Sequence, residues 1–315
     1  MEQLKRLLNI SAVGVASVVA ALVARHFALA GWPLHHANLW LVAVAAIVML
    51  AAYAAKAWGW QRLFRHGQRP AVLTLAAAGG AASVGGLALP GRCDEVIRVA
   101  VVRRCRRRRA SIGAVALSLF LLGLLDSAAM TPLASVALGM SRIDGWLRVG
   151  FVVVAGAGVL AAAAVFALPR VSAFPIVARF RLGGWIGEHA TPPREAAWAW
   201  VGVAVSWGLR ALAMFVLLAA LGFGMNFALA IAFVCASSAA AVLPVAPAGA
   251  AMQAGAGAAI LVASGVRTEE AVAFGIAAQA LLIAVGAMFV LALGAWHAQG
   301  AVVSRSRLRY SSGAR

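Results

Sequence analysis

The sequence predicts an all-α protein that crosses a membrane several times. Of its 315 residues, 64% are hydrophobic and only 11% are charged, whereas a soluble domain averages about a quarter charged residues. Apolar runs of about 20 residues, the length that crosses a bilayer as a helix, recur along the chain. Two further apolar regions are interrupted by proline and glycine. We therefore expect a single membrane domain over residues 1–315, with about six full transmembrane helices and two broken hairpins.

Six apolar runs are long enough for full crossings, and they are residues 7–24, 39–60, 111–138, 147–168, 196–221 and 270–296. The first run follows Lys5 and Arg6, a pattern shared by cleaved signal peptides, and Ala28-Leu29-Ala30 resembles a cleavage site. We prefer an uncleaved first span, because the run is long for a signal core and a polytopic chain follows.

The two broken regions are residues 71–109 and 227–264. The breaks lie at Pro90 and Gly91 in the first region and at Pro244, Pro247 and Gly249 in the second. Each break leaves pieces too short to cross comfortably, so we expect each region to enter and leave from one face as a re-entrant hairpin. The flanking spans then form an inverted repeat, with residues 39–138 matching residues 196–296 in opposite orientation. Two hairpins that enter from opposite faces are typical of alternating-access transporters.

Basic residues set the orientation. Lysine and arginine outnumber aspartate and glutamate by 27 to 9, which gives a net charge of +18. If neither hairpin crosses, the strongly basic segments all fall on one side, as cytoplasmic loops do. These segments are the N-terminus, residues 62–69, 103–109 and 169–195, and the tail 297–315. We expect an inner-membrane protein with both termini in the cytoplasm. The arginine run at 103–109 adjoins membrane segments, which favours anionic lipid head groups over nucleic acid as its partner.

Charged residues gather directly after the first break. Asp94, Glu95 and Arg98 lie within one helical turn, and Glu95 and Arg98 are spaced to form an ion pair. Arg92 and Arg98 could hold a lipid phosphate by two parallel hydrogen bonds, which suits the planar guanidinium. Either acid could meet a cationic head group or take up a proton. The alternative is that all of these charges lie at a wet cytoplasmic rim and only anchor the hairpin.

Three polar residues inside apolar segments are further candidates for substrate contacts. Asp126 and Arg210 lie well within predicted spans, where charges are functional candidates by default. They could pair with each other, and Arg210 could instead extend toward one interface. Gln253 is neutral and more typical of an interhelical hydrogen bond. The cysteines Cys93, Cys105 and Cys235 have no histidine at ligand spacing, so we expect no metal site, and we expect no cofactor.

The residues around the first break resemble a family motif. The flippase-like membrane domain of bacterial lysylphosphatidylglycerol synthases and their stand-alone relatives carries Pro-x-Arg-x-Gly-Glu-x-x-Arg. Pro90, Arg92, Glu95 and Arg98 match this motif, whereas Asp94 replaces its glycine. The resemblance covers most of residues 40–296.

Two further positions bear on the resemblance. Asp126 matches an acid that the family tends to carry in the next span. The second hairpin of the family usually reads Pro-x-x-Pro-Gly-Gly-x-Gly-x-x-Glu. Pro244, Pro247 and Gly249 match it, Ala248 and Ala251 depart from it, and the neutral pair Gln253-Ala254 stands where the motif ends in its acid. If that acid couples transport to protons in relatives, this chain lacks the step or has moved it.

The resemblance implies a lipid translocase without enzymatic activity. Its cargo would be a phospholipid, an aminoacylated phospholipid or a polyprenyl or hopanoid lipid, with an anionic or zwitterionic head group. We expect no lysyl transfer, because the aminoacyl-transferring domain of the synthases is absent from this sequence. Two alternatives remain open. One is a non-transporting membrane partner of a lipid-biosynthesis or lipid-glycosylation enzyme, and the other is an intramembrane transferase that uses Asp94 or Glu95 as its base.

Overall fold

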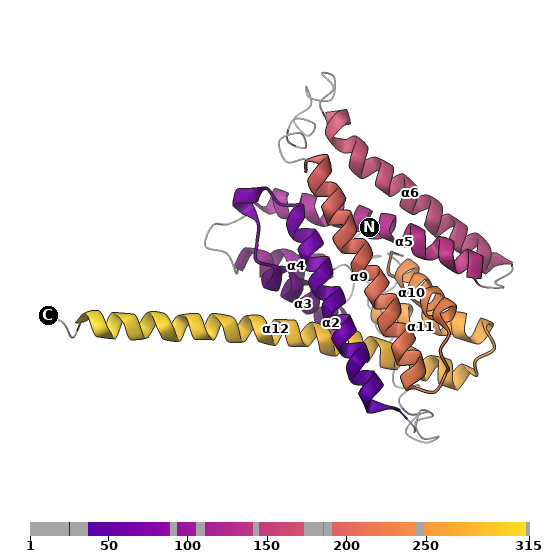
Figure 1. Ribbon diagram of the computed structural model, residues 1–315. Helices are drawn as coiled ribbons and strands as arrows, with labels where there is room; N and C mark the ends of the chain where they lie inside the picture. The colour runs from indigo at the N-terminus through magenta and orange to yellow at the C-terminus, as the bar shows by residue number, and fades with distance from the viewer. Residues whose placement is uncertain are drawn as a thin grey trace, which may run out of the picture.

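All regular secondary structure that the structure describes is helical (Figure 1). The computed structural model describes residue 25 and residues 37–88, 93–104, 111–140, 145–172, 185, 191–242 and 249–312. Within these residues there is no strand, and the predicted all-α class is confirmed. The predicted first span, 7–24, lies outside them, as do Pro90, Gly91, Arg92, Pro244 and Pro247.

The described helices follow the predicted apolar runs closely. They are α2 (Leu39–Arg62), α3 (Val72–Ala88), α4 (Cys93–Arg104), α5 (Ile112–Met140), α6 (Trp146–Ser172), α9 (Pro193–Ala220), α10 (Phe227–Val242), α11 (Gly249–Ala263) and α12 (Thr268–Ser312), with a 3₁₀ turn at His66–Gln68. Five stretches are long and apolar enough to cross a membrane: Leu39–Arg62, Ile112–Gly139, Arg148–Val171, Pro193–Ala220 and Thr268–Gln299. Each coincides with a predicted span. The two broken regions instead hold the short helices α3, α4, α10 and α11.

Helices α2 and α9 form an antiparallel pair at the centre of the molecule (Figure 1). Their backbones nearly touch, because a Cβ atom added to Gly202 would lie 2.8 Å from the Cα of Gly59. Small residues allow such a close approach between membrane helices. At one end the Asn38 N–H donates to the Ala220 carbonyl at 2.9 Å. At the other end the Thr191 hydroxyl donates to the Leu63 carbonyl at 3.3 Å. The pair is therefore fixed along its whole length.

The four short helices form two pairs, and each pair packs on a long helix from the other half of the chain. Helices α3 and α4 form one pair and α10 and α11 another, and α3 also packs on α12 while α10 packs on α5. The contact between α3 and α12 is again glycine on glycine, because a side chain on Gly80 would collide with the backbone of Gly286. Helix α6 packs mainly on α5. The buried core runs through these contacts and is mostly alanine, leucine, valine and phenylalanine.

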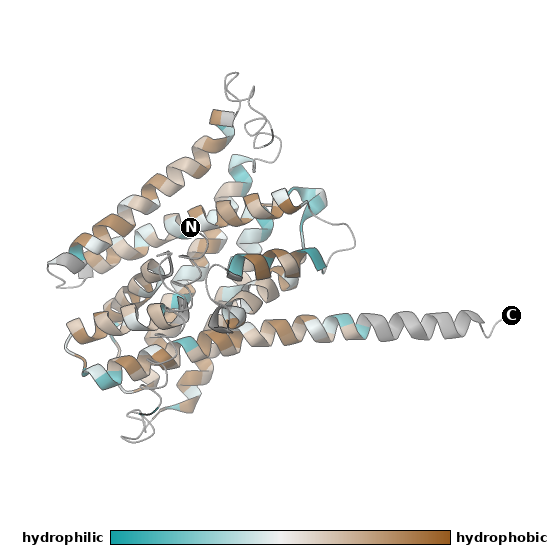
Figure 2. Cartoon of the chain, turned by 180° about the vertical axis from the view of Figure 1, so that it is seen from behind, coloured by the Kyte–Doolittle hydropathy of each residue, from teal (hydrophilic) through white to brown (hydrophobic). Residues whose placement is uncertain are grey.

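The outer surface is apolar, as expected for a chain surrounded by lipid. Large apolar side chains such as Leu160, Val153 and Leu291 are more than half exposed, and a soluble protein rarely displays so many together. In Figure 2 the helix bodies are mostly brown or pale, and the teal residues gather mainly near helix ends. The chain is thus a multi-pass membrane protein. Charged groups inside its helical body are energetically costly and are therefore candidates for function.

Candidate functional site

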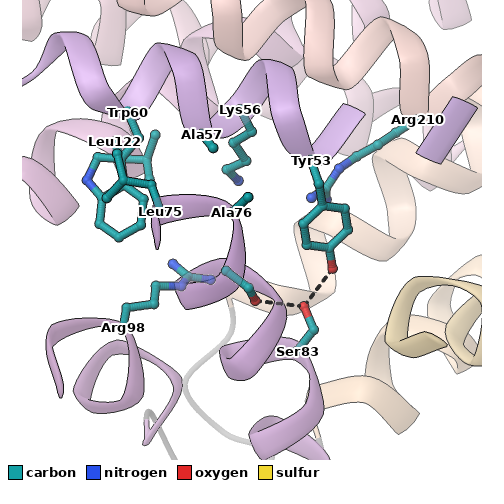
Figure 3. A pocket seen from close by; sticks show the side chains of 11 residues that line it. Tyr53, Lys56, Ala57, Trp60, Leu75, Ala76, Ser83, Arg98, Leu122 and Arg210 are labelled. Atoms are coloured by element: carbon teal, nitrogen blue, oxygen red, sulfur yellow. Dashed lines mark hydrogen bonds between the residues drawn. The ribbon is translucent and has the colours of Figure 1, made fainter. Parts of the chain in front are cut away.

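A polar pocket lies where α2, α3, α4, α5 and α9 meet (Figure 3). It encloses about 400 Å³ of empty space, part of which opens to solvent. Its lining residues are Tyr53, Lys56, Ala57, Trp60, Leu75, Ala76, Gly79, Ser83, Leu122, Arg98 and Arg210. Cationic side chains thus reach one space from three different helices. In Figure 3 Lys56 points from α2 toward α3, while Arg98 extends from α4 into the same region.

Lys56 and Asp126 form an ion pair beside the pocket. The Lys56 Nζ lies 2.8 Å from the Asp126 Oδ2, and the two side chains are 20% and 24% exposed. The other carboxylate oxygen, Oδ1, accepts a hydrogen bond from the Trp207 indole N–H at 2.9 Å. Both oxygens of Asp126 are therefore engaged, and this acid is compensated within the protein.

Arg210 has no such compensation. Its guanidinium stacks over the ring of Trp207 at 4.8 Å and over the ring of Tyr53 at 5.5 Å. Among the described residues no carboxylate lies within salt-bridge distance of Arg210, and its buried Nε makes no hydrogen bond. Stacking on aromatic faces holds an arginine in place without neutralising its charge. The Arg210 charge therefore remains available to a ligand in the pocket.

Tyr53 joins the pocket wall to two other helices. Its hydroxyl lies 2.8 Å from the Ser83 Oγ on α3 and 3.4 Å from the Leu282 carbonyl on α12, and it can donate its one proton to either. The Ser83 hydroxyl in turn donates to the Gly79 carbonyl at 3.2 Å. Because the ring of Tyr53 lies under Arg210, this network also fixes the position of the guanidinium.

The motif after the first break contributes one residue to the pocket. Arg98 lines it, pairs with Asp94 at 3.5 Å and leaves its buried Nε without a hydrogen bond. The expected Glu95–Arg98 pair is not formed, and Glu95 is exposed. Both the three-residue and the four-residue spacing allow an ion pair on a helix, and here Arg98 takes the four-residue partner, Asp94.

Of the other predicted site residues, some lie near the pocket and others do not. Asp126 and Arg210 both reach this region, but they are joined through Trp207 rather than paired directly. Gln253 is half-buried on α11 and does not line the pocket, and Gly249 begins that helix. Arg92 lies outside the described residues.

Sequence reasoning missed Lys56. It is a charged residue inside an otherwise apolar span, so the rule that identified Asp126 and Arg210 applies to it equally. Trp207 and Tyr53 carried no comparable signal, because aromatic residues are common on every face of a membrane helix. Their roles depend on which residues the neighbouring helices place opposite them.

Formal charges make the pocket electropositive. Lys56, Arg98 and Arg210 contribute three positive charges, and the carboxylates of Asp94 and Asp126 compensate two of them. The aromatic faces of Trp207 and Tyr53 are already covered by cations. The arrangement therefore suits an anionic group, and it leaves these rings unable to cage an ammonium group.

Comparison with known proteins identifies the family of the chain. A family model described as the lysylphosphatidylglycerol synthase TM region matches residues 8–294. The chain belongs to this family. No curated protein and no solved structure matches the chain. Membership of the lysylphosphatidylglycerol synthase transmembrane family confirms the resemblance seen in the sequence and indicates a lipid-related role in the membrane.

Proposed function

We propose that this protein translocates an anionic lipid across the inner membrane, with the lipid head group passing through the pocket around Arg210. The observation that carries the proposal is an arginine within a membrane span that no carboxylate of the described residues compensates. A lone arginine at the centre of a membrane helix costs about 3 kcal/mol. Charge-assisted hydrogen bonds contribute roughly 1.5–3 kcal/mol each, so a bound phosphate would offset most of that cost.

The cargo in this proposal is an anionic phospholipid, or an aminoacylated or polyprenyl lipid that presents its phosphate to the pocket. Arg210 and Arg98 each carry a buried Nε without a hydrogen bond, and a guanidinium binds phosphate through two parallel N–H donors. Lys56 can exchange its contact with Asp126 for the phosphate as the head group arrives. Zwitterionic head groups are disfavoured, because the aromatic faces that would hold their ammonium are covered by Arg210 and Lys56.

We propose alternating access between two inverted repeats as the mechanism, with α3–α4 and α10–α11 as re-entrant hairpins. The packing pattern supports this: α2 and α9 pair at the centre, α3 packs on α12, and α10 packs on α5. In the proposed repeat α3 corresponds to α10 and α12 corresponds to α5. The contact between α3 and α12 therefore has its counterpart in the contact between α10 and α5. The distribution of arginines supports a cytoplasmic location for both termini.

Transport rather than catalysis is proposed because, among the described residues of the pocket and of α4, no buried acid is left uncompensated. Asp126 is held by Lys56 and Trp207, Asp94 pairs with Arg98, and Glu95 is exposed. A general base needs an uncompensated carboxylate within reach of the reacting group.

The decisive experiment measures head-group accessibility in proteoliposomes that contain purified protein. The exposure rate of each labelled lipid is compared between the unsubstituted protein and Arg210→Gln. The lipids are phosphatidylglycerol, its lysyl ester, a polyprenyl phosphate and a hopanoid. We expect the variant to slow exposure of the transported lipid about tenfold, the loss of one charge-assisted pair. Arg210→Lys should be intermediate, because it keeps the charge and loses the planar fork. The matched control is Arg170→Gln, an exposed arginine in the last turn of α6. Unchanged transport by a folded Arg210→Gln protein would refute the proposal.

A second candidate function is a non-transporting partner of a lipid-processing enzyme. The end of the second motif favours it, because the neutral residues Gln253 and Ala254 stand where the family motif has its acid. A stable complex with such an enzyme, together with no lipid movement by the protein alone, would support this role over translocation.

A further inference from the structure

A second hollow lies between α3, α4 and α12. Its lining residues are Ala77, Ala81, Val101, Arg104, Val290, Leu293, Gly294 and His297, and it holds about 550 Å³ of empty space. Apart from Arg104 and His297 the lining is entirely apolar. None of these residues lines the translocation pocket around Arg210. We call this hollow the α12 groove.

The groove exists because small residues line its floor. Ala77 and Ala81 lie on successive turns of α3, and Gly294 faces them from α12. A Cβ atom added to Gly294 would meet no atom within 4 Å, so the space beside this glycine is open. Interiors are normally packed without such gaps, and an apolar gap at a lipid-facing surface is filled by lipid chains.

The surrounding surface faces lipid at the level of the head groups. Leu291 is 71% exposed and Trp296 is 68% exposed on the same helix. Exposed apolar residues of this size mark contact with acyl chains, and tryptophan prefers the membrane interface. The crossing part of α12 is Thr268–Gln299, so Trp296 and His297 lie in its last turn.

The polar end of the groove is suited to a phosphate. Arg104 is exposed in the last turn of α4, and no carboxylate of the described residues lies within 4 Å of it. The Nδ1–H of His297 donates to the Leu293 carbonyl at 2.9 Å, so Nε2 of the neutral ring is an acceptor and Arg104 supplies the donors at this end of the groove. An apolar channel that ends at a cation complements a phospholipid, whose acyl chain and anionic phosphate are joined in that order.

We propose that the α12 groove binds a resident anionic phospholipid, with one acyl chain along α3 and α12 and the phosphate at Arg104. This site is separate from the translocation pocket and does not depend on transport. Helix α4 carries Arg98 on its pocket side and Val101 and Arg104 at the groove. The bound lipid therefore supports the helix that positions Arg98.

The test uses purified protein in nanodiscs that contain phosphatidylglycerol with a photoreactive acyl chain. After irradiation, adducts are mapped on proteolytic peptides by mass spectrometry. We expect adducts in the α3 segment 77–81 and the α12 segment 290–297, reduced by unlabelled phosphatidylglycerol but not by phosphatidylcholine. Arg104→Gln should lower these adducts about tenfold, the effect of losing a charged hydrogen-bond donor. Gly294→Leu should remove them by filling the groove, because its added atoms enter open space.

Matched controls lie on α6. Gly156 is exposed and also has open space at its Cβ, and Arg170 is an exposed arginine at the end of a span, so Gly156→Leu and Arg170→Gln should leave the adducts unchanged. Arg210→Gln should also leave them unchanged while slowing transport, which separates this site from the translocation pocket. Adducts of equal yield for phosphatidylcholine, or unaltered by Arg104→Gln in monodisperse protein, would indicate ordinary annular lipid and overturn the proposal. Absence of adducts from both segments in the unsubstituted protein would also overturn it.

Discussion

The two broken regions differ in charge far more than in architecture. Each consists of two short helices, α3 with α4 and α10 with α11, and each packs on a long helix of the other half. Helix α4 carries Asp94, Glu95 and Arg98 together with two terminal arginines, whereas α11 carries no charged residue at all. The first region borders the electropositive pocket, and the second forms an aromatic core in which Phe233 packs on Phe274 at 5.0 Å. Two regions of similar architecture thus differ in character: α3 and α4 border a charged pocket, and α10 and α11 form an apolar core.

The largest expected effect comes from unbalancing the charged region. Asp126→Asn removes the partner of Lys56, which then lies uncompensated in a pocket shared with Arg98 and Arg210. We expect a loss of about 2–3 kcal/mol in stability, below the 3–5 kcal/mol for fully buried pairs because both side chains are partly exposed. Thermal unfolding in lipid nanodiscs measures it.

A double substitution supplies the control. Lys56→Met with Asp126→Asn removes both charges, and the asparagine oxygen can still accept the hydrogen bond from Trp207. The double variant should regain most of the lost stability without regaining transport. If it unfolds as readily as the single variant, the cost of Asp126→Asn does not come from the uncompensated lysine.

Glycine contacts compare the two regions without involving charge. Gly80→Ala would drive a methyl group into the backbone of Gly286, and Gly275→Ala would place one 2.8 Å from the Ala254 carbonyl. We expect each to cost about 1–3 kcal/mol, as overpacking does. Only Gly80→Ala should also impair transport, because α3 carries the Ser83 contact to Tyr53. Unfolding temperatures and lipid exposure rates are measured together.

Gly208→Ala on α9 is the matched control, since a Cβ there meets nothing within 4 Å. It should change neither stability nor transport appreciably. An equal loss of transport in Gly80→Ala and Gly275→Ala, at equal stability, would contradict the division of roles between the two regions.

The sequence predicts the frame of this molecule better than its contacts. Five spans coincide with apolar runs, because about 20 apolar residues have few other stable arrangements. Asp126 and Arg210 were identified because a charge within a span is costly and therefore meaningful. Their partners could not be predicted, since pairing depends on how each helix is rotated. Asp126 meets Lys56 from α2, and Arg210 meets the rings of Tyr53 and Trp207.

The α12 groove could not be predicted from the sequence at all. It is formed by Ala77 and Ala81 on α3 and by Gly294 on α12, residues far apart in the chain and ordinary for membrane helices. Small residues predict close packing, and here the same residue types also leave a gap. Only the relative placement of α3 and α12 decides which of these occurs.

The smallest expected effect compares one serine in each region. The Ser83 hydroxyl links Tyr53 to α3, while the buried Ser237 hydroxyl on α10 makes no hydrogen bond among the described residues. Ser83→Ala should slow lipid exposure a few-fold, because a lost neutral hydrogen bond costs about 1 kcal/mol and frees the ring beneath Arg210. Ser237→Ala should leave transport unchanged and raise stability slightly, since it removes an unsatisfied buried hydroxyl. If instead Ser237→Ala slows transport more than Ser83→Ala, the apolar region takes part in lipid movement and the asymmetry between the two regions is structural only.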